Sequence, residues 1–460
     1  MLALQQLLRE AWPGGRTVAR VAALTPMVAL LALACSEPSA APPSPETQPR
    51  ASQISNLPKG MTEAEVRAHV IAPPHVSGVD VDVVDPAREA RYDIGSQSTA
   101  VAPNLDISAL GTPTLSLGTF GLKIHKALRD SSAGYMLQVR QNGVLVHTGV
   151  WNWAQTPTDL GQGWSETTRM HVASASKFLT AVALVKALDA KGISYNAKIV
   201  GYLPTYWAKG PKIDQITFRH LLTHTSGLSA NNSATDYAYM KAKVAAGVSS
   251  VGTGAYANMN FGLMRILIPI INGSVSKGAK YSDLSFLNDL TWDAVTIKYY
   301  KQNMQDKVFT PAGVVAAGFA PTFYYKNALA YKSSYALNTE PGWNSGDLTT
   351  VAGPAGWRLS TKELLNVMNH VRRKNTIISA AKAQYMLDNY FGIDQVISTP
   401  AGKIYNKNGG WGKYGRKEQC VAYFLPNGME LALFVDSPIG AGDRSLRGLV
   451  KDAFLASLTY

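Results

Sequence analysis

The residues best suited to chemistry are a serine and a lysine three positions apart, Ser174 and Lys177. Residues at i and i+3 share one face of a helix, so the serine hydroxyl and the lysine amine can meet. A lysine in a partly desolvated site loses affinity for its proton and can then accept the proton of the serine. The start of a helix also favours negative charge that develops nearby. The pair therefore predicts an activated nucleophile, and an N-cap serine is the alternative interpretation.

The segment that must position this pair is long and apolar. Nearly every residue from 178 to 188 is apolar, and Gly192 supplies a stop signal. A helix that is apolar on almost all sides is a buried one. The sequence therefore predicts a rigid, buried helix directly after Ser174.

Two further Ser-x-x-Lys matches lack such a support. Residues 274–277 lie between glycines, which predicts a loop. Residues 379–382 open a short amphipathic helix, so Ser379 is expected to be an N-cap. Ser174 is therefore the preferred nucleophile of the three.

Two other polar clusters could complete a site. Tyr256 and Asn258 lie two apart in a turn before a second apolar helix, predicted over 261–271, and can aim their side chains the same way. Residues 407–409, Lys-Asn-Gly at a strand edge, offer a cation, an amide and a close approach of the backbone. The plainer interpretations are a packed tyrosine in a polar turn and a glycine-rich loop with a solvent lysine. A second Tyr-x-Asn occurs at 325–327.

Two histidines have the i, i+4 spacing of zinc ligands, His220 and His224. No glutamate follows the first, and the Ser-Gly after the second predicts that the helix ends there. Structural hydrogen bonding is therefore the preferred role, and neither a metal nor a cofactor is expected. Cys420 lies in a strand-like run and is interpreted as a buried structural thiol.

The N-terminal part of the 460-residue chain has the layout of an export signal. Three arginines precede an apolar run over 21–34 that is too short to span a bilayer comfortably. Cys35 follows this run and resembles the lipidated first residue of a bacterial lipoprotein, and cleavage without lipidation is the alternative. We thus expect a signal peptide over 1–35, a tether and N-terminal extension over 36–118, and one large domain over 119–460. The expected location is the periplasm or an outer membrane face, with Cys35 as the anchor.

Composition and charge argue against one class of function, nucleic-acid binding. The net charge of +13 is scattered along the chain, without Lys/Arg runs interleaved with aromatics, so a solvated basic surface is expected rather than nucleic-acid binding. Two hairpins are predicted, over 134–149 around Asn142-Gly143 and over 419–435 around Pro426-Asn427-Gly428. Helices and loops are expected over 195–341, and a helix over 444–458 closes the chain.

Taken in order, Ser-x-x-Lys at 174–177, Tyr-x-Asn at 256–258 and Lys-Asn-Gly at 407–409 resemble the serine β-lactamase and penicillin-binding-protein superfamily. The resemblance is on the side of class C β-lactamases, D,D-peptidases and related esterases. It runs from about residue 120 to 460 and includes the stretches 220–228 and 352–368. It implies an α+β fold, with an antiparallel sheet flanked by helices and a mostly helical subdomain.

The resemblance also implies catalytic roles. Ser174 would attack a carbonyl and form an acyl-enzyme, while Lys177 and Tyr256 share the movement of the proton. The backbone N–H groups of Ser174 and Gly410 would form the oxyanion hole. Water would then release the acyl group.

Substrate binding would fall to the other motif residues. Asn258 would hold a substrate amide or carbonyl, and Lys407 would keep the tyrosine ionisable and attract a substrate carboxylate, with Asn408 and Gly409 beside it. Asn408 stands where the lactamases usually have Thr or Ser, which weakens recognition of a β-lactam carboxylate. We therefore expect a hydrolase of a D-amino-acid peptide, an ester or a β-lactam. The alternative is a catalytically silent penicillin-binding-like sensor or binding module at the cell envelope.

Overall fold

The computed structural model describes residues 54–71, 79–80, 111–228, 235–322, 326–332, 340–440 and 445–460. The export signal and Cys35 lie outside these residues, so both stay predictions. Within the described part of the chain, every helix is too short or too polar to cross a bilayer.

The centre of the fold is an antiparallel sheet built from eight of the described strands. The order across the sheet is β1-β9-β10-β11-β3-β4-β5, and β8 also pairs with β9. The strands are β1 (Val79–Asp80), β3 (Gly134–Gln141), β4 (Val144–Gln155), β5 (Gln162–Gly163), β8 (Gln395–Thr399), β9 (Gly402–Lys413), β10 (Arg416–Leu425) and β11 (Met429–Val435). Two small ladders accompany it: β2 (Thr114–Leu115) pairs with β12 (Leu458–Thr459), and β6 (Met170–His171) pairs with β7 (Arg358–Leu359).

Both predicted hairpins are confirmed. Asn142 and Gly143 link β3 to β4 with φ angles of 54° and 84°. Asn427 and Gly428 link β10 to β11 with φ angles of 56° and 69°. Positive φ at two successive residues matches the twist of the flanking strands, and Asn-Gly adopts it at little cost.

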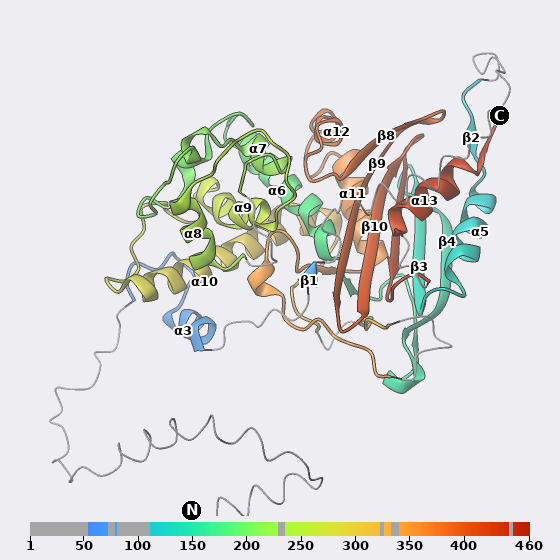
Figure 1. Ribbon diagram of the computed structural model, residues 1–460, viewed down its shortest axis with the longest axis horizontal. Helices are drawn as coiled ribbons and strands as arrows, with labels where there is room; N and C mark the ends of the chain where they lie inside the picture. The colour runs from blue at the N-terminus through green and yellow to red at the C-terminus, as the bar shows by residue number, and fades with distance from the viewer. Residues whose placement is uncertain are drawn as a thin grey trace, which may run out of the picture. The chain divides into compact units, whose positions relative to one another are not determined.

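Helices cover both faces of the sheet (Figure 1). On one face lie α5 (Leu117–Leu128) and α13 (Leu446–Leu455), whose buried side chains form a core with the strands. On the other face lie α11 (Thr361–Arg372) and, near one end of the sheet, α12 (Ala380–Asp388). The last helix is shorter than the one predicted over 444–458, because the chain returns to an extended β12 at its end.

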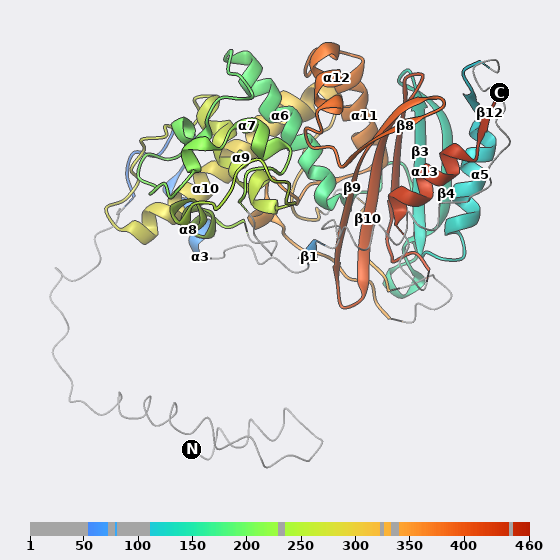
Figure 2. The same ribbon diagram turned by 45° about the horizontal axis from the view of Figure 1, so that its top comes forward.

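Beside the sheet lies a helical region, seen at the left of Figures 1 and 2. It comprises α6 (Ser176–Ala190), α7 (Phe218–Leu222), α8 (Tyr237–Ala246), α9 (Asn258–Ile271) and α10 (Ser285–Met304). The expected α+β fold, with an antiparallel sheet and a mostly helical region, is confirmed. The prediction of a buried helix after Ser174 is confirmed too, since α6 is buried from Ser176 through Val185.

Part of the N-terminal extension packs on this region. Helix α3 (Glu63–Ile71) begins with the capping box of Thr62 and Glu65, and Val66 is fully buried in the main core. Residues 54–71 of the extension therefore belong to the same compact unit as the sheet and the helical region, and the domain boundary after 118 stays a prediction.

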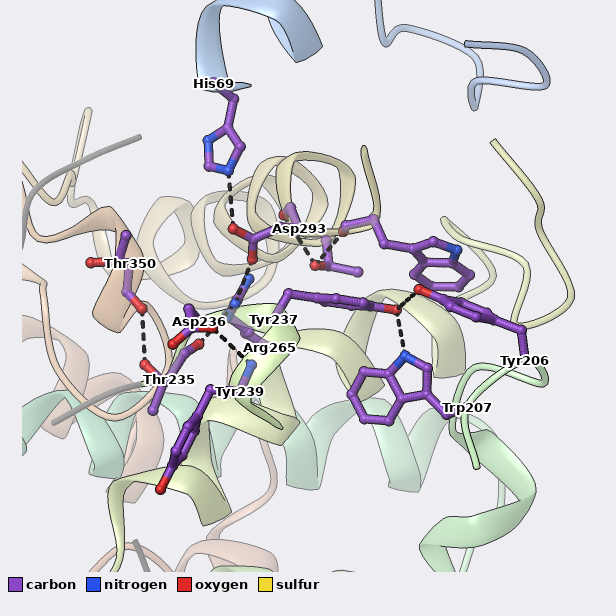
Figure 3. Close-up of polar contacts among 12 residues, drawn as sticks. His69, Tyr206, Trp207, Thr235, Asp236, Tyr237, Tyr239, Arg265, Asp293 and Thr350 are labelled. Atoms are coloured by element: carbon purple, nitrogen blue, oxygen red, sulfur yellow. Dashed lines mark hydrogen bonds and ion pairs between the residues drawn. The ribbon is translucent and has the colours of Figure 1, made fainter. Parts of the chain in front are cut away.

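A buried ion pair holds the far end of α3 to the helical region (Figure 3). His69 Nε2 lies 3.0 Å from one carboxylate oxygen of Asp293, and Arg265 donates to the other oxygen at 2.6 Å. Burial raises the pKa of the Asp293 carboxyl, but Arg265 and His69 together hold it below its usual value. The carboxylate therefore stays charged between α10, α9 and α3.

Candidate active site

The Ser174 hydroxyl lies in a short 3-10 turn, Ala173–Ala175, directly before α6. Lys177 stands in the first turn of α6 and donates to Ser174 Oγ at 2.6 Å. Ala173 has a φ of 44°, an uncommon conformation for a residue with a side chain. Such strain persists only where the surrounding structure fixes the backbone. The turn thus holds the serine ahead of the helix instead of within it.

The N-cap interpretation of Ser174 is wrong. The cap position of α6 is Ala175, and no side chain caps the helix. Ser379, by contrast, accepts a hydrogen bond from the Lys382 N–H and caps α12, as predicted. Residues 274–277 form the loop that the sequence predicts.

Lys177 is fully buried among groups of the candidate site. Besides Ser174, its Nζ contacts the carbonyl oxygen of Pro354 at 3.2 Å. It also lies 4.7 Å from the centre of the Tyr256 ring. A buried amine needs such acceptors, and they direct Nζ at the serine hydroxyl.

Tyr256 approaches the same serine from the turn before α9. Its hydroxyl donates to Ser174 Oγ at 2.8 Å, so one oxygen contacts both the amine and the phenol. Its ring stacks on His224, with centres 4.3 Å apart and planes at 28°. The structure therefore brings Ser174, Lys177 and Tyr256 into direct contact.

His224 supports the tyrosine and is electrically neutral. Burial lowers the pKa of its imidazole well below the usual value, and the nearby Lys177 and Lys407 charges lower it further. Its Nδ1 accepts from the Ala257 N–H at 3.2 Å and lies 3.1 Å from Asn260 Nδ2. Sequence reasoning identified the hydrogen bonding of this histidine but missed its place behind Tyr256.

The two histidines do not form a metal site. His220 completes the capping box of α7, where its Nδ1 accepts from the Thr217 N–H at 3.2 Å. Among the residues that the structure describes, no group of three or more His, Cys, Asp or Glu side chains is arranged to hold a metal ion.

The Lys-Asn-Gly motif lies within β9, against the serine turn. A methyl group on Gly409 would lie 2.1 Å from the Val172 carbonyl oxygen and 3.0 Å from the Ser174 nitrogen. Only glycine permits this approach, which sets the backbone of β9 beside the backbone of Ser174. Cys420, opposite Gly409 on β10, is buried as predicted, with its Sγ 3.1 Å from the same carbonyl.

The neighbouring motif side chains point to opposite faces of β9, as the alternation of a strand requires. Lys407 Nζ faces the site, 5.2 Å from the centre of the Tyr256 ring. The side-chain oxygen of Asn408 instead lies 3.3 Å from Arg447 of α13, on the other face of the sheet. The structure thus brings Lys407 to the tyrosine but directs the Asn408 side chain away from it.

Asp394 is a site residue that sequence reasoning missed. Its carboxylate accepts from Lys407 Nζ at 2.5 Å and from the Asn408 N–H at 3.1 Å. Both side chains of the ion pair are almost fully buried. An aspartate just before a short strand carries no motif, so only the pairing of β8 with β9 reveals its position.

Two features bear on substrate access and recognition. Ser174 and Lys177 have no exposed surface, whereas Tyr256 is half-buried. Ser174 Oγ is therefore covered in this structure, and a molecule that contacts it must displace neighbouring side chains. Asn258, the first residue of α9, is buried, and its Oδ1 makes no hydrogen bond within the described part of the chain. This oxygen is an acceptor that a substrate N–H could satisfy.

Comparisons with known proteins agree with this fold. The esterase/beta-lactamase LipL of Mycobacterium tuberculosis (strain ATCC 25618 / H37Rv) is 32% identical over 118 residues, which are 24% of this chain and 27% of that protein. The match thus spans only about a quarter of the relative.

Solved structures share the fold at low sequence identity. FmtA from Staphylococcus aureus is 15% identical, with a TM-score of 0.54 over 87% of this chain and 97% of that one. The D-amino acid amidase from Ochrobactrum anthropi SV3, complexed with D-phenylalanine, is 16% identical, with a TM-score of 0.50 over 73% and 98% of the two chains. The Beta-lactamase family model matches residues 124–444, which include Ser174, Tyr256 and Lys407. The chain belongs to the Beta-lactamase family.

Proposed function

We propose that this protein is a serine hydrolase that cleaves an amide or ester through an acyl-enzyme at Ser174. One observation carries the proposal: Ser174 Oγ lies 2.6 Å from Lys177 Nζ and 2.8 Å from the Tyr256 hydroxyl. A serine within hydrogen-bonding distance of a buried amine and a phenol has the arrangement of an activated nucleophile. Membership of a family that includes hydrolases supports the same reaction.

In the proposed reaction, Ser174 Oγ attacks the carbonyl carbon and gives its proton to the Lys177–Tyr256 pair. The carbonyl oxygen becomes an oxyanion held by the backbone N–H groups of Ser174 and Gly410, each worth about 3 kcal/mol in other hydrolases. The leaving group departs with the proton returned by the pair. Water then attacks the acyl carbon and gives a proton to the same pair. The pair passes this proton to Ser174 Oγ as the bond between Oγ and the acyl group breaks, which releases the acid and restores the serine hydroxyl.

The proposed substrates are short-chain esters and amides, including amides of D-amino acids. The mycobacterial relative is an esterase/beta-lactamase, which supports the first class, and a D-amino acid amidase with the same fold supports the second. The unsatisfied Oδ1 of Asn258 favours a substrate that carries an N–H group near the reacting carbonyl.

The test is labelling of the purified protein with a fluorophosphonate, a serine-reactive probe without a carboxylate, followed by peptide mapping. We expect an adduct on Ser174 that is lost in Ser174→Ala. Ser274→Ala is the matched control, because Ser274 belongs to a second Ser-x-x-Lys in a surface loop and should leave labelling unchanged. Labelling that persists in Ser174→Ala would refute the assignment. A turnover screen with short esters, D-amino-acid amides and nitrocefin would then identify the substrate class.

The burial of Ser174 favours one alternative, a catalytically silent binding module. Such a module would bind a ligand reversibly without forming an adduct. Saturable binding of a penicillin or a D-amino-acid amide, with no labelled serine and no turnover, would select this alternative.

A further inference from the structure

The outer edge of β9 is occupied on both sides of the proposed oxyanion position. β8 pairs with β9 up to Asn406, and β1 pairs with it from Trp411 onward. Both lie on the edge opposite to β10. Among the described residues, no strand pairs with the stretch 407–410 on this edge, and that stretch contains Gly410.

Asp394 contacts the first two residues of that stretch, Lys407 and Asn408. One of its carboxylate oxygens accepts from the Asn408 N–H at 3.1 Å, and the other accepts from Lys407 Nζ at 2.5 Å. The Asp394 N–H also donates to the Asn406 carbonyl at 2.9 Å. The carboxylate is therefore held in place by β9 itself, at a residue two positions before Gly410, the proposed oxyanion donor.

This carboxylate changes what Lys407 can do. The side chains of Lys407 and Asp394 keep 3% and 8% of their surface exposed, so water screens their charges little. A carboxylate on a substrate that approaches Lys407 would be attracted by the ammonium and repelled by the carboxylate in contact with it. The pair is close to neutral overall, and the His224 imidazole that stacks on Tyr256 is neutral as well. Lys177, the other cation near Tyr256, donates its hydrogen bond to Ser174 Oγ.

We infer that Asp394 is a specificity-determining residue that makes this site select acyl donors without a carboxylate, that is, esters and amides that carry no negative charge. The inference rests on the proposed function, because it concerns the same acyl-enzyme at Ser174. It assigns Lys407 to a fixed internal pair that faces Tyr256, instead of to a carboxylate of the substrate. Asp394 acts through Lys407 and is therefore a positioning residue.

The test compares two acyl donors that differ mainly in charge, p-nitrophenyl butyrate and mono-p-nitrophenyl succinate. For the parent protein we expect kcat/KM to be at least tenfold higher with the uncharged ester. In Asp394→Asn the preference should shift toward the anionic ester by at least tenfold, mainly through a lower KM for that ester. Asp394→Glu should restore the parent preference.

Asp388→Asn is the matched control. Asp388 also bridges to a lysine of β9, accepting from Lys403 at 3.0 Å, but at an exposed position away from Tyr256. Its substitution should leave the preference between the two esters unchanged.

The outcomes separate the two proposals. Absence of turnover with both esters, together with absence of a Ser174 adduct, would overturn the proposed function and this inference with it. A Ser174 adduct with equal or better use of the anionic ester by the parent protein would overturn the inference alone, whether or not Asp394→Asn folds. An unchanged preference in a folded Asp394→Asn would do the same.

Discussion

Substitution of Gly409 by alanine tests the contact between β9 and the serine turn. The added methyl would lie 2.1 Å from the Val172 carbonyl oxygen, whereas an ordinary contact is about 3.5 Å. The backbone nitrogens of Ala175 and Ser174 lie 2.9 and 3.0 Å from the same methyl carbon, so a small shift of the methyl does not relieve the clash. All three atoms belong to the backbone, so the strand and the turn must separate by about 1 Å.

A displacement of this size next to the nucleophile predicts a large loss of rate. Misplacement by about 1 Å can cost about 100-fold in rate, which is about 2.7 kcal/mol of transition-state stabilisation. Overpacking of a fitted contact adds a loss of about 1–3 kcal/mol in the free energy of unfolding. We therefore expect kcat/KM for an ester to fall by about two orders of magnitude, while Tm falls by a few degrees.

The assay is ester hydrolysis under kcat/KM conditions, with Tm measured on the same preparations. Gly318→Ala is the control, because a methyl group there would meet nothing within 4 Å and its φ is not positive. That variant should keep the parent rate and Tm. If Gly409→Ala also kept both, the close approach of β9 to the Val172–Ala175 turn, and the oxyanion position built on it, would be refuted.

The remaining predictions concern stability. Burial raises the pKa of Glu430 to about 7 from 4.5, so the folded protein holds a proton that the unfolded chain has lost, and stability falls as the pH rises from 4.5 to 7. Urea unfolding at pH 8 should give Glu430→Gln a free energy of unfolding up to about 3 kcal/mol higher than that of the parent. Equal free energies of unfolding would contradict this. For His224, burial lowers the pKa well below 6.5, so the unfolded chain binds the extra proton and stability falls on acidification below that pH. His224→Gln should therefore lose less stability than the parent between pH 7 and 5, and parallel losses would count against the neutral imidazole. Finally, a chain that starts at residue 53 should keep the parent Tm, while one that starts at 81 should melt at a lower temperature because it lacks the buried contacts of α3 and the pairing of β1. Equal melting temperatures for the two truncated chains would refute that role of the extension.

Much of the site could be predicted because its signals are local. The i, i+3 spacing sets Ser174 and Lys177 together, and an apolar run fixes the helix that supports them. The Asn-Gly turns give two hairpins, and the order of three short motifs gives the family. Each motif and each turn is itself a run of residues close in the chain, and only the order of the motifs spans a longer distance.

The features that were missed depend on contacts between distant segments. Asp394 meets Lys407 only because β8 pairs with β9, and no spacing along the chain announces that pairing. The 3-10 turn Ala173–Ala175 likewise lies against Gly409 of β9, which is a contact between segments far apart in the chain. The direction of the Asn408 side chain follows from the strand alternation of β9, once the motif is known to lie within a strand.

Lys177, Tyr256 and Lys407 differ in how strongly the fold fixes their positions relative to Ser174. Ser174 and Lys177 are neighbours on one short piece of backbone, so their 2.6 Å contact survives any shift between helices and sheet. Tyr256 belongs to the turn before α9 and Lys407 belongs to β9. The distance of 5.2 Å between Lys407 Nζ and the centre of the Tyr256 ring therefore depends on how α9 and β9 pack against each other. A small sliding of one element past the other would leave the serine and its amine poised while it disconnected the phenol. Relative motion of α9 and β9 would thus change the rate of the proposed reaction while Ser174 and Lys177 stay in contact.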